Sequence, residues 1–175
     1  MKYEDVRNDI KHGDVVSVYH SGIFAALIRL VQRIAGFGEL SGVTHNGVAW
    51  WLQGRLYCIE MNGINNVLRP MSHYKSFKML IHECPCTRPA MASLFAQETE
   101  NPYIYSWSDI FRIGVRLIFK SGRGYGEKNE AVCSTFVSSW LKSAGWVPPA
   151  DFPDMPSPAE IAKALGQPAF VIDQS

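Results

Sequence analysis

Two strand-like runs separated by a two-residue turn constrain the fold of this chain most strongly. Residues 45–52 and 55–61 are rich in β-branched, aromatic and other apolar side chains, and only Gln53 and Gly54 lie between them. A connection this short is typical of a tight antiparallel β-hairpin. A two-residue turn also sets the register, so that Leu52 faces Arg55 and Gly47 faces Glu60.

Short strands in the first half and helices in the second half predict an α+β fold. We expect a small antiparallel sheet or partial barrel packed against helices. The sequence contains no internal repeat and no low-complexity linker, which predicts a single domain over residues 1–175. The further strands are predicted at 13–19 and 78–82 with an edge strand at 170–172, and the helices at 23–34, 91–97, 110–119, 131–144 and 158–165.

The helix predicted at 23–34 is amphipathic. Its apolar stripe recurs at helical spacing from Phe24 to Ile34, and Arg29 and Arg33 fall on another face. We interpret the stripe as ordinary core packing, although basic residues beside a large apolar face are also typical of a helix on a membrane surface. The apolar stretch is shorter than the roughly 20 residues that span a bilayer, so no transmembrane helix is predicted.

Charge and cysteine content narrow the classes of partner and compartment. The 175-residue chain has 17 basic and 16 acidic side chains and a formal net charge of +1. That balance lacks the clustered positive charge of a nucleic-acid-binding domain. The acidic start at residues 1–5 differs from a secretory signal, so we expect a cytoplasmic protein with free thiols. Relocation by a lysis or secretion system stays open, and the oligomeric state is not predicted.

Cys133 is the cysteine with a reactive position. A thiol in the first turn of a helix lies near the positive end of the peptide dipoles and near free N–H groups, which favour the thiolate. Of the four cysteines, only Cys133 falls at such a predicted helix start. The structural alternative is a small buried residue that packs beside Phe136 and Val137.

The hairpin supplies a base and an orienting group for such a thiol. A nucleophilic cysteine needs an imidazole to take its proton, and the imidazole needs a partner that orients it. The predicted register makes His45 the diagonal same-face neighbour of Glu60, at a Cβ separation of about 7–8 Å. His45 alone also fits a structural histidine, but Glu60 in a largely apolar strand requires a partner.

Four short motifs together resemble a known family. In chain order they are Gly13-Asp14-Val15-Val16, Thr44-His45-Asn46-Gly47-Val48, Ile59-Glu60 and Val132-Cys133-Ser134-Thr135-Phe136-Val137. Their order resembles the circularly permuted NlpC-type papain-fold family of cysteine peptidases and amidases, over roughly residues 13–165. The resemblance implies a permuted papain-like fold, with Cys133 as nucleophile, His45 as general base and acid, and Glu60 as the orienting group.

The resemblance also implies the chemistry. It implies hydrolysis of an amide bond in a peptide, an amino-acid amide or a peptidoglycan-derived fragment, through a thioester and without a cofactor. The backbone N–H of Cys133 is one candidate oxyanion donor, and Tyr19 or His20 at the end of the first strand is a second. Trp51 is a candidate wall of the substrate groove because it shares a strand face with His45. Both aromatic residues also fit the core.

Three alternatives remain at this stage. The same triad fits a lipid acyl hydrolase or acyltransferase of the lecithin:retinol acyltransferase-like type, and the fold alone fits a non-enzymatic binding module. His82, Cys84 and Cys86 provide three soft metal ligands, but a structural zinc site needs four, so we expect no metal. The glycine-rich segment 122–126 precedes the nucleophile helix and is interpreted as a flexible connector or lid.

Overall fold

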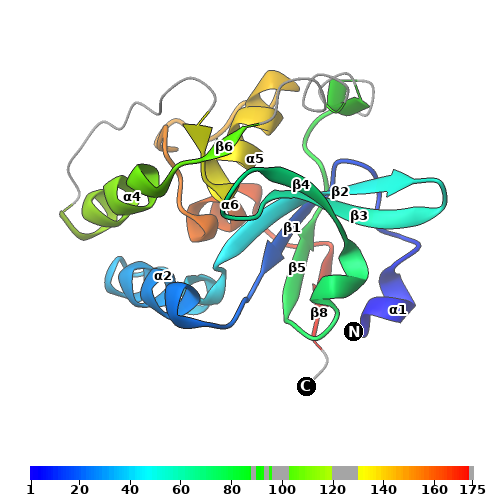
Figure 1. Ribbon diagram of the computed structural model, residues 1–175, viewed down its shortest axis with the longest axis horizontal. Coiled ribbons are helices and arrows are strands. Elements are labelled where there is room, and N and C mark those ends of the chain that lie inside the picture. The colour runs from blue at the N-terminus through cyan, green and yellow to red at the C-terminus, as the bar shows by residue number, and fades with distance from the viewer. Residues whose placement is uncertain (88–89, 93–94, 96–102, 120–129, 174–175) are drawn as a thin grey trace.

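The computed structural model describes residues 1–87, 90–92, 95, 103–119 and 130–173. It contains a six-stranded antiparallel open sheet packed against helices, as Figure 1 shows. The elements are α1 (Tyr3–Val6), β1 (Val15–Val18), α2 (Ile23–Ile34), the short 3-10 helix η1 (Gly38–Gly42), β2 (His45–Leu52), β3 (Arg55–Met61), β4 (Asn66–Pro70), the short 3-10 helix η2 (Met71–Tyr74), β5 (Met79–His82), β6 (Ile104–Tyr105), α4 (Trp107–Phe119), β7 (Glu130–Ala131), α5 (Cys133–Ser143), α6 (Pro158–Leu165) and β8 (Phe170–Ile172). The strand order is β4-β3-β2-β1-β5-β8.

The β2–β3 hairpin has the register that the sequence predicts. Leu52 pairs with Arg55 and Gly47 pairs with Glu60. Gln53 and Gly54 have φ values of 49° and 73°, so both turn residues adopt the left-handed conformation that a two-residue hairpin turn requires. The turn therefore fixes which side chains of β2 and β3 share a face.

Gly47 allows β2 and β3 to pack closely beside His45 and Glu60. A Cβ atom at Gly47 would lie 2.3 Å from Sγ of Cys58 and 2.9 Å from the carbonyl oxygen of Ile59. Neither distance is tolerated, so a side chain here would displace the strand that carries Glu60. The glycine thus sets the spacing between the strand of His45 and the strand of Glu60.

Each face of the sheet carries its own core. On one face, side chains of β1, β2 and β3 pack against α5 and α6, including Val15, Val48, Ile59, Phe136 and Ile161. On the other face the sheet packs against α1 and η2. The two chain ends lie side by side, because the Met1 carbonyl accepts a hydrogen bond from the backbone N–H of Asp173.

The predicted helices that the structure describes begin and end within three residues of their predicted bounds, and Ser157 caps the start of α6. The Ser157 hydroxyl accepts from the Glu160 N–H at 3.3 Å, and the Glu160 carboxylate accepts from the Ser157 N–H at 2.7 Å. Most of the helix predicted at 91–97 and the glycine-rich segment 120–129 lie outside the described residues.

The interpretation of α2 as a core helix holds for only part of its apolar stripe, because Val31 packs against the buried cluster that contains Ile113 and Leu117 of α4. The helix has the predicted bounds, but Phe24, Leu27 and Ile34 of the apolar stripe are more than half exposed. The buried face instead carries Ala25 and Gln32. Hydrogen bonds made by the Gln32 amide hold the helix in this rotation, because that side chain is fully buried with all its partners inside the protein.

Several small elements were not predicted. They are α1, η1, β4, η2 and the parallel pair β6–β7. Within the part of the chain that the structure describes, no helix has both the length and the apolar character needed to cross a membrane.

Candidate active site

His45 and Glu60 meet at the end of the hairpin. His45 begins β2 and Glu60 lies near the end of β3, and His45 Nε2 is 2.7 Å from Glu60 Oε2. The Glu60 side chain is only 1% exposed, whereas the imidazole is partly open to the surface. The hairpin register therefore brings the predicted base and the predicted orienting group into direct contact.

Two further residues hold the Glu60 carboxylate. Arg69 of β4 donates from Nε to Glu60 Oε1 at 2.5 Å, and the Tyr74 hydroxyl of η2 donates to Oε2. Sequence reasoning missed both residues, because neither β4 nor η2 was recognised. The signal was the buried carboxylate itself, since a group of that kind needs more than one donor.

These three donors keep Glu60 ionised. Burial would raise the pKa of the carboxyl, but hydrogen bonds from His45, Tyr74 and Arg69 outweigh burial and lower the pKa to about 2. Burial, together with the nearby negative charge, raises the pKa of the Tyr74 hydroxyl, so this group remains a donor. The imidazole of His45 consequently faces a fixed negative charge.

Cys133 is the first residue of α5, as predicted. The preceding Val132 is extended, with φ −102° and ψ 170°, and its N–H donates to Thr135 Oγ1 at 2.9 Å. The Ser134 hydroxyl donates to the Pro156 carbonyl at 2.6 Å, which ties the first turn to the loop before α6. Cys133 is 6% exposed, and its backbone N–H belongs to the helix start, where N–H groups have no acceptor within the helix.

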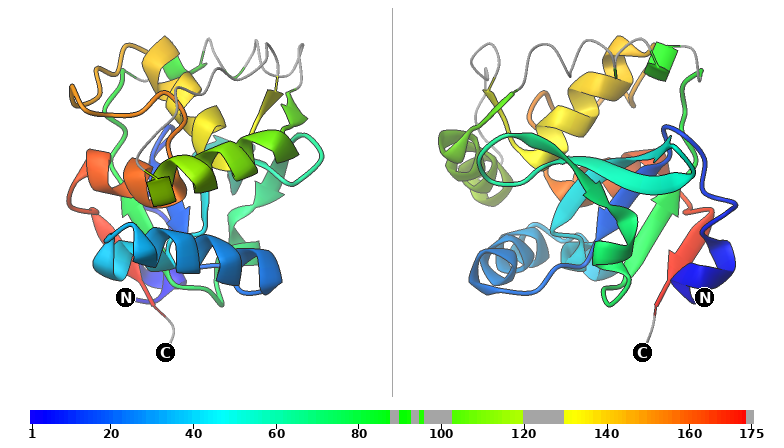
Figure 2. Two further views of the ribbon diagram at one scale, coloured as in Figure 1. Left: turned by 90° about the vertical axis from the view of Figure 1, so that its left-hand side faces the viewer. Right: turned by 45° about the vertical axis from the view of Figure 1, so that its right-hand side comes forward.

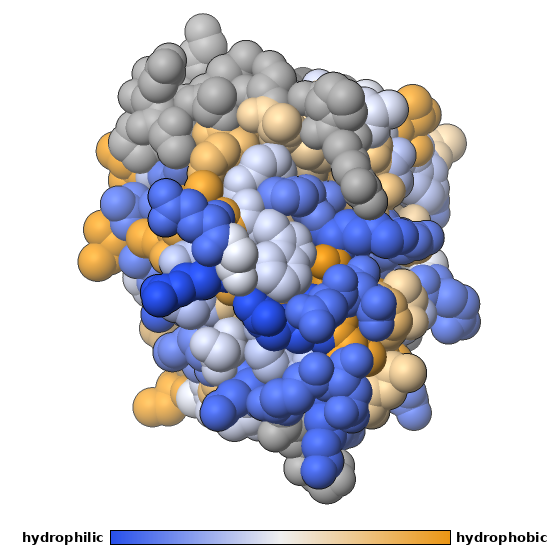
Figure 3. All heavy atoms as spheres, turned by 90° about the vertical axis from the view of Figure 1, so that its right-hand side faces the viewer, coloured by the Kyte–Doolittle hydropathy of each residue, from blue (hydrophilic) through white to orange (hydrophobic). Residues whose placement is uncertain are grey.

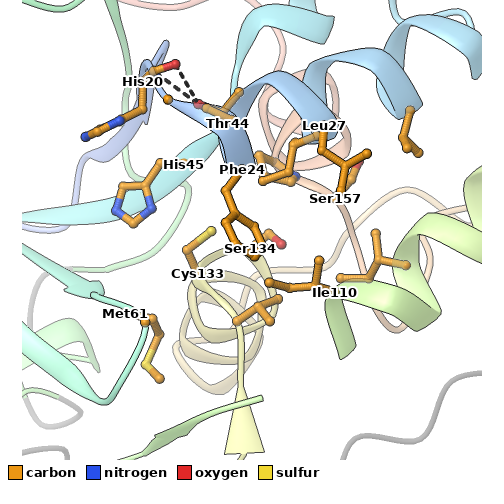
Figure 4. A pocket seen from close by; sticks show the side chains of 18 of the residues that line it. His20, Phe24, Leu27, Thr44, His45, Met61, Ile110, Cys133, Ser134 and Ser157 are labelled. Carbon is orange, nitrogen blue, oxygen red and sulfur yellow. Dashed lines mark hydrogen bonds between the residues drawn. The ribbon is translucent and has the colours of Figure 1, made fainter. Parts of the chain in front are cut away.

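The imidazole of His45 connects Cys133 with Glu60. Burial acts to lower the pKa of His45, but hydrogen bonds and charge interactions with Cys133 and Glu60 outweigh it and raise the pKa to about 10. Because Nε2 contacts Glu60, Nδ1 is the nitrogen left for the sulfur. Figure 4 shows His45 and Cys133 on facing sides of one cavity. The arrangement supplies a nucleophile, a proton carrier and a carboxylate that orients it.

The cavity beside this triad is large and mostly apolar. Its volume is about 1170 Å³, and Cys133, His45 and Glu60 are among the residues that line it. Phe24 and Leu27 reach into it from α2, and Ile110 reaches in from α4, as Figure 4 shows. Apolar side chains of α2 and α4 therefore share one cavity with the Cys133 side chain.

Tyr105 also belongs to the site and was not predicted. It ends β6, pairs with Ala131 just before Cys133, and lines the same cavity. Burial, and then the neighbouring Cys133 sulfur, raise the pKa of the Tyr105 hydroxyl, so it stays protonated as a potential donor. The parallel β6–β7 pair places it there, and that pair is too short to recognise from the sequence.

The structure does not bring Tyr19 or Trp51 to the site. The Tyr19 hydroxyl donates to the Glu39 carbonyl at 3.4 Å, and its ring packs against Gly42. Trp51 lies six residues from His45, which along an extended strand is about 20 Å. Its indole N–H donates to the Ile10 carbonyl at 2.7 Å instead. Tyr19 and Trp51 therefore have the structural, core-packing roles that were the alternatives to a role in the site.

His20, the other candidate donor, does line the cavity. Its ring stacks on Phe77 with 4.6 Å between centroids, and its Nδ1 lies 2.7 Å from the Ser21 carbonyl oxygen. Its backbone N–H donates to Thr44 Oγ1 at 2.9 Å, one of the contacts drawn in Figure 4. These contacts hold His20 beside the cavity mouth with one ring nitrogen already engaged.

The residues considered for a metal site do not converge: His82 is buried in the interior, and Cys84 and Cys86 make hydrogen bonds within the protein. Burial lowers the pKa of His82 to about 4, so this side chain is neutral and part of the interior at neutral pH. The Cys86 thiol donates to the Leu141 carbonyl at 3.3 Å. Among the described residues, no three His, Cys, Asp or Glu side chains are grouped to hold a metal ion.

Comparison with known proteins gives only distant structural likeness. No family model matches this chain, and a search of curated proteins finds no match. Among solved structures, the crystal structure of metalloprotein yiiX from Escherichia coli O157:H7, described as DUF1105, aligns with 88% of this chain and 79% of its own. The TM-score is 0.46 and the sequence identity is 16%.

Proposed function

We propose that this chain is a cysteine hydrolase of permuted papain-like, NlpC-type fold that cleaves an amide bond by acyl transfer. The substrate class that we propose first is a peptide, an amino-acid amide or a peptidoglycan-derived fragment. One observation carries the proposal: the imidazole of His45 is hydrogen-bonded to the buried Glu60 and lines the same cavity as Cys133, the first residue of α5.

The geometry supports a two-step reaction. The Cys133 thiolate attacks the substrate carbonyl carbon and forms a C–S bond, and the carbonyl electron pair moves to oxygen. When the tetrahedral intermediate collapses, the His45 imidazolium gives its proton to the leaving amine. The neutral imidazole then takes a proton from water, which attacks the thioester and releases the acid. Glu60 stabilises the imidazolium throughout without changing its own protonation.

The proposed reaction uses two donors to stabilise the oxyanion. The backbone N–H of Cys133 lies at the positive end of α5, where charge develops during attack. The Tyr105 hydroxyl is the second donor that we propose, in place of Tyr19, because it lines the cavity beside the sulfur.

An acyl-enzyme measurement tests this proposal. We expect incubation with a small peptidyl p-nitroanilide, followed by acid quench, to give an acyl adduct that peptide mapping places on Cys133. Cys133→Ala should abolish the adduct, and His45→Ala should slow its formation by about 10²- to 10⁴-fold. The matched control is Cys86→Ser, which should form the adduct normally. An adduct that survives in Cys133→Ala would refute the proposal.

A second candidate function keeps the triad but changes the acyl group. The lining of the cavity beside Cys133 includes many apolar side chains of α2 and α4, which favours the acyl chain of a lipid ester over a polar peptide. Rates of hydrolysis of p-nitrophenyl esters with acyl chains of increasing length distinguish the lipid-ester function from the peptide function. A rate constant that rises by about tenfold or more from acetyl to dodecanoyl supports the lipid ester. Faster turnover of the peptidyl anilide supports the peptide.

A further inference from the structure

The apolar stripe of α2 faces outward as a continuous surface. Ile23 is 91% exposed, and Leu30 and Ile34 are 55% and 62% exposed. Phe24 and Leu27 belong to the same stripe and turn toward the cavity mouth. A contiguous exposed apolar surface of this kind is uncommon on monomeric soluble proteins. It marks a site that binds another protein, a membrane or an apolar ligand.

The outward rotation of α2 is built into the fold. The Gln32 amide donates to the Ser41 carbonyl at 3.0 Å and to the Val43 carbonyl at 2.7 Å, and its oxygen accepts from the Ala159 N–H at 3.0 Å. Turning the helix to bury its apolar stripe would break all three hydrogen bonds and leave a buried amide unpaired. The hydrogen bonds of Gln32 therefore keep the apolar stripe of α2 exposed.

α4 extends the same surface. Phe24 of α2 and Trp107 of α4 meet edge to face, with ring centroids 5.1 Å apart. Phe111 is 75% exposed and Ile118 is also exposed, and both lie on the stripe of α4 that begins at Trp107. Figure 2 (left) shows α2 and α4 side by side at this end of the molecule, and Figure 3 shows mainly hydrophilic side chains over the middle of the opposite end.

The charged residues on α2 and α4 indicate which kind of partner this surface binds. α2 carries Arg29 and Arg33 and no acidic residue, and Arg33 is exposed. On α4 the charges balance, because Arg112 pairs with the buried Asp109 at 3.2 Å and Arg116 pairs with Glu160. The surface is thus apolar and aromatic, with the exposed Arg33 beside it and no acidic residue on α2, while Arg29 donates to the His20 carbonyl at 2.7 Å. That composition suits an interface with anionic headgroups, whereas a second copy of the chain would add a second Arg33 to the same contact.

We propose that the outer faces of α2 and α4 dock this protein on a bilayer that contains anionic lipids. The exposed side chains of both helices enter the interfacial region, and Arg33 contacts the headgroups. The proposal goes beyond the hydrolase function and stands without it, since no step of the docking uses the chemistry of Cys133. If the lipid ester is the substrate, the docked orientation also opens the cavity of the active site toward the acyl chains.

Vesicle sedimentation tests the docking. We expect the full chain to sediment with vesicles of equimolar phosphatidylcholine and phosphatidylglycerol, and less with phosphatidylcholine alone. Leu30 and Ile34 are not among the described cavity-lining residues, so Leu30→Ser/Ile34→Ser changes the surface alone and should weaken binding about tenfold or more. Arg33→Glu should weaken binding mainly to the anionic vesicles, by roughly fivefold. Leu52→Ser, at the tip of the β2–β3 hairpin, is the matched control and should bind normally.

Two further measurements distinguish docking on a bilayer from catalysis and from self-association. Cys133→Ala should bind vesicles as tightly as the unaltered chain, so a failed hydrolase assay leaves the docking result intact. Circular dichroism verifies that each variant is folded. Absence of sedimentation, or equal sedimentation of Leu30→Ser/Ile34→Ser, would overturn the proposal. Light scattering that shows a dimer which Leu30→Ser/Ile34→Ser dissociates would also overturn it, by assigning the surface to a second copy.

Discussion

At the scale of single residues, Glu60 is the organising group of the site. Its two oxygens accept hydrogen bonds from His45, Arg69 and Tyr74, which lie on three different elements. A buried carboxylate with that many donors is held rigidly, and its charge makes the imidazolium of His45 more stable than in water. In the reaction that we propose, Glu60 therefore keeps the imidazole of His45 charged and oriented for proton transfer.

Glu60→Gln tests that role. The amide keeps the shape of the side chain but removes the charge, so the pKa of His45 should fall and the imidazolium should be less populated. We expect turnover to drop by about tenfold or more, while the far-ultraviolet circular dichroism spectrum stays unchanged. Turnover equal to that of the unaltered chain would remove Glu60 from the mechanism.

His82 makes a different prediction, about stability. Its pKa is lowered to about 4 in the folded chain from an ordinary value of 6.5, so the unfolded state binds a proton first as pH falls. Above pH 6.5 His82 is neutral in both states and does not reduce the free energy of unfolding. As the pH falls from 6.5 toward 4, the free energy of unfolding decreases by up to about 3 kcal/mol. His82→Leu should flatten the urea-unfolding free energy across that range. A slope unchanged in the variant would contradict this role of His82.

At the scale of elements, some parts of the fold follow from local sequence and others do not. The β2–β3 hairpin was predicted with its register, because two residues between two apolar runs leave few geometries. The contact of His45 with Glu60 followed from that register. β4 was missed because Asn66–Pro70 lacks an alternating apolar pattern, and with it Arg69 was missed.

The partial error on α2 has a clear physical origin. An amphipathic pattern gives the direction of the apolar stripe relative to the helix, but not which side faces the protein. Three tertiary hydrogen bonds of Gln32 decide that question here. They involve η1, the residue after it and the start of α6, and those partners are not visible in a local window of sequence.

Gln32→Leu tests the importance of those bonds. The change keeps the volume similar but leaves the Ser41 and Val43 carbonyls and the Ala159 N–H without their partner. We expect the free energy of unfolding to fall by about 1–3 kcal/mol, measured by urea denaturation. Leu27→Ser, on the outward stripe of the same helix, should cost less than Gln32→Leu. The opposite order would show that the apolar stripe, and not Gln32, anchors the helix.

At the scale of the whole molecule, the site is assembled where separate parts of the chain converge. β2 and β3 supply His45 and Glu60, β4 and η2 supply the two supporting donors, and α5 supplies Cys133. The sequence order of the motifs predicted three of these residues, through a family resemblance. The cavity between α2 and α4 was beyond the sequence, because it depends on how two helices sit relative to the sheet.

The central claim is that Cys133 and His45 form an activated pair, and thiol alkylation tests it most directly. A haloacetamide pulse at mildly acidic pH, with peptide mapping of each cysteine, gives four separate rates. Burial raises the pKa of Cys58, Cys84 and Cys86, so these thiols should react slowly. We predict that Cys133 reacts fastest in the folded chain and that His45→Ala abolishes this selectivity. Equal rates at all four cysteines, or an unchanged pattern in His45→Ala, would contradict the activated pair.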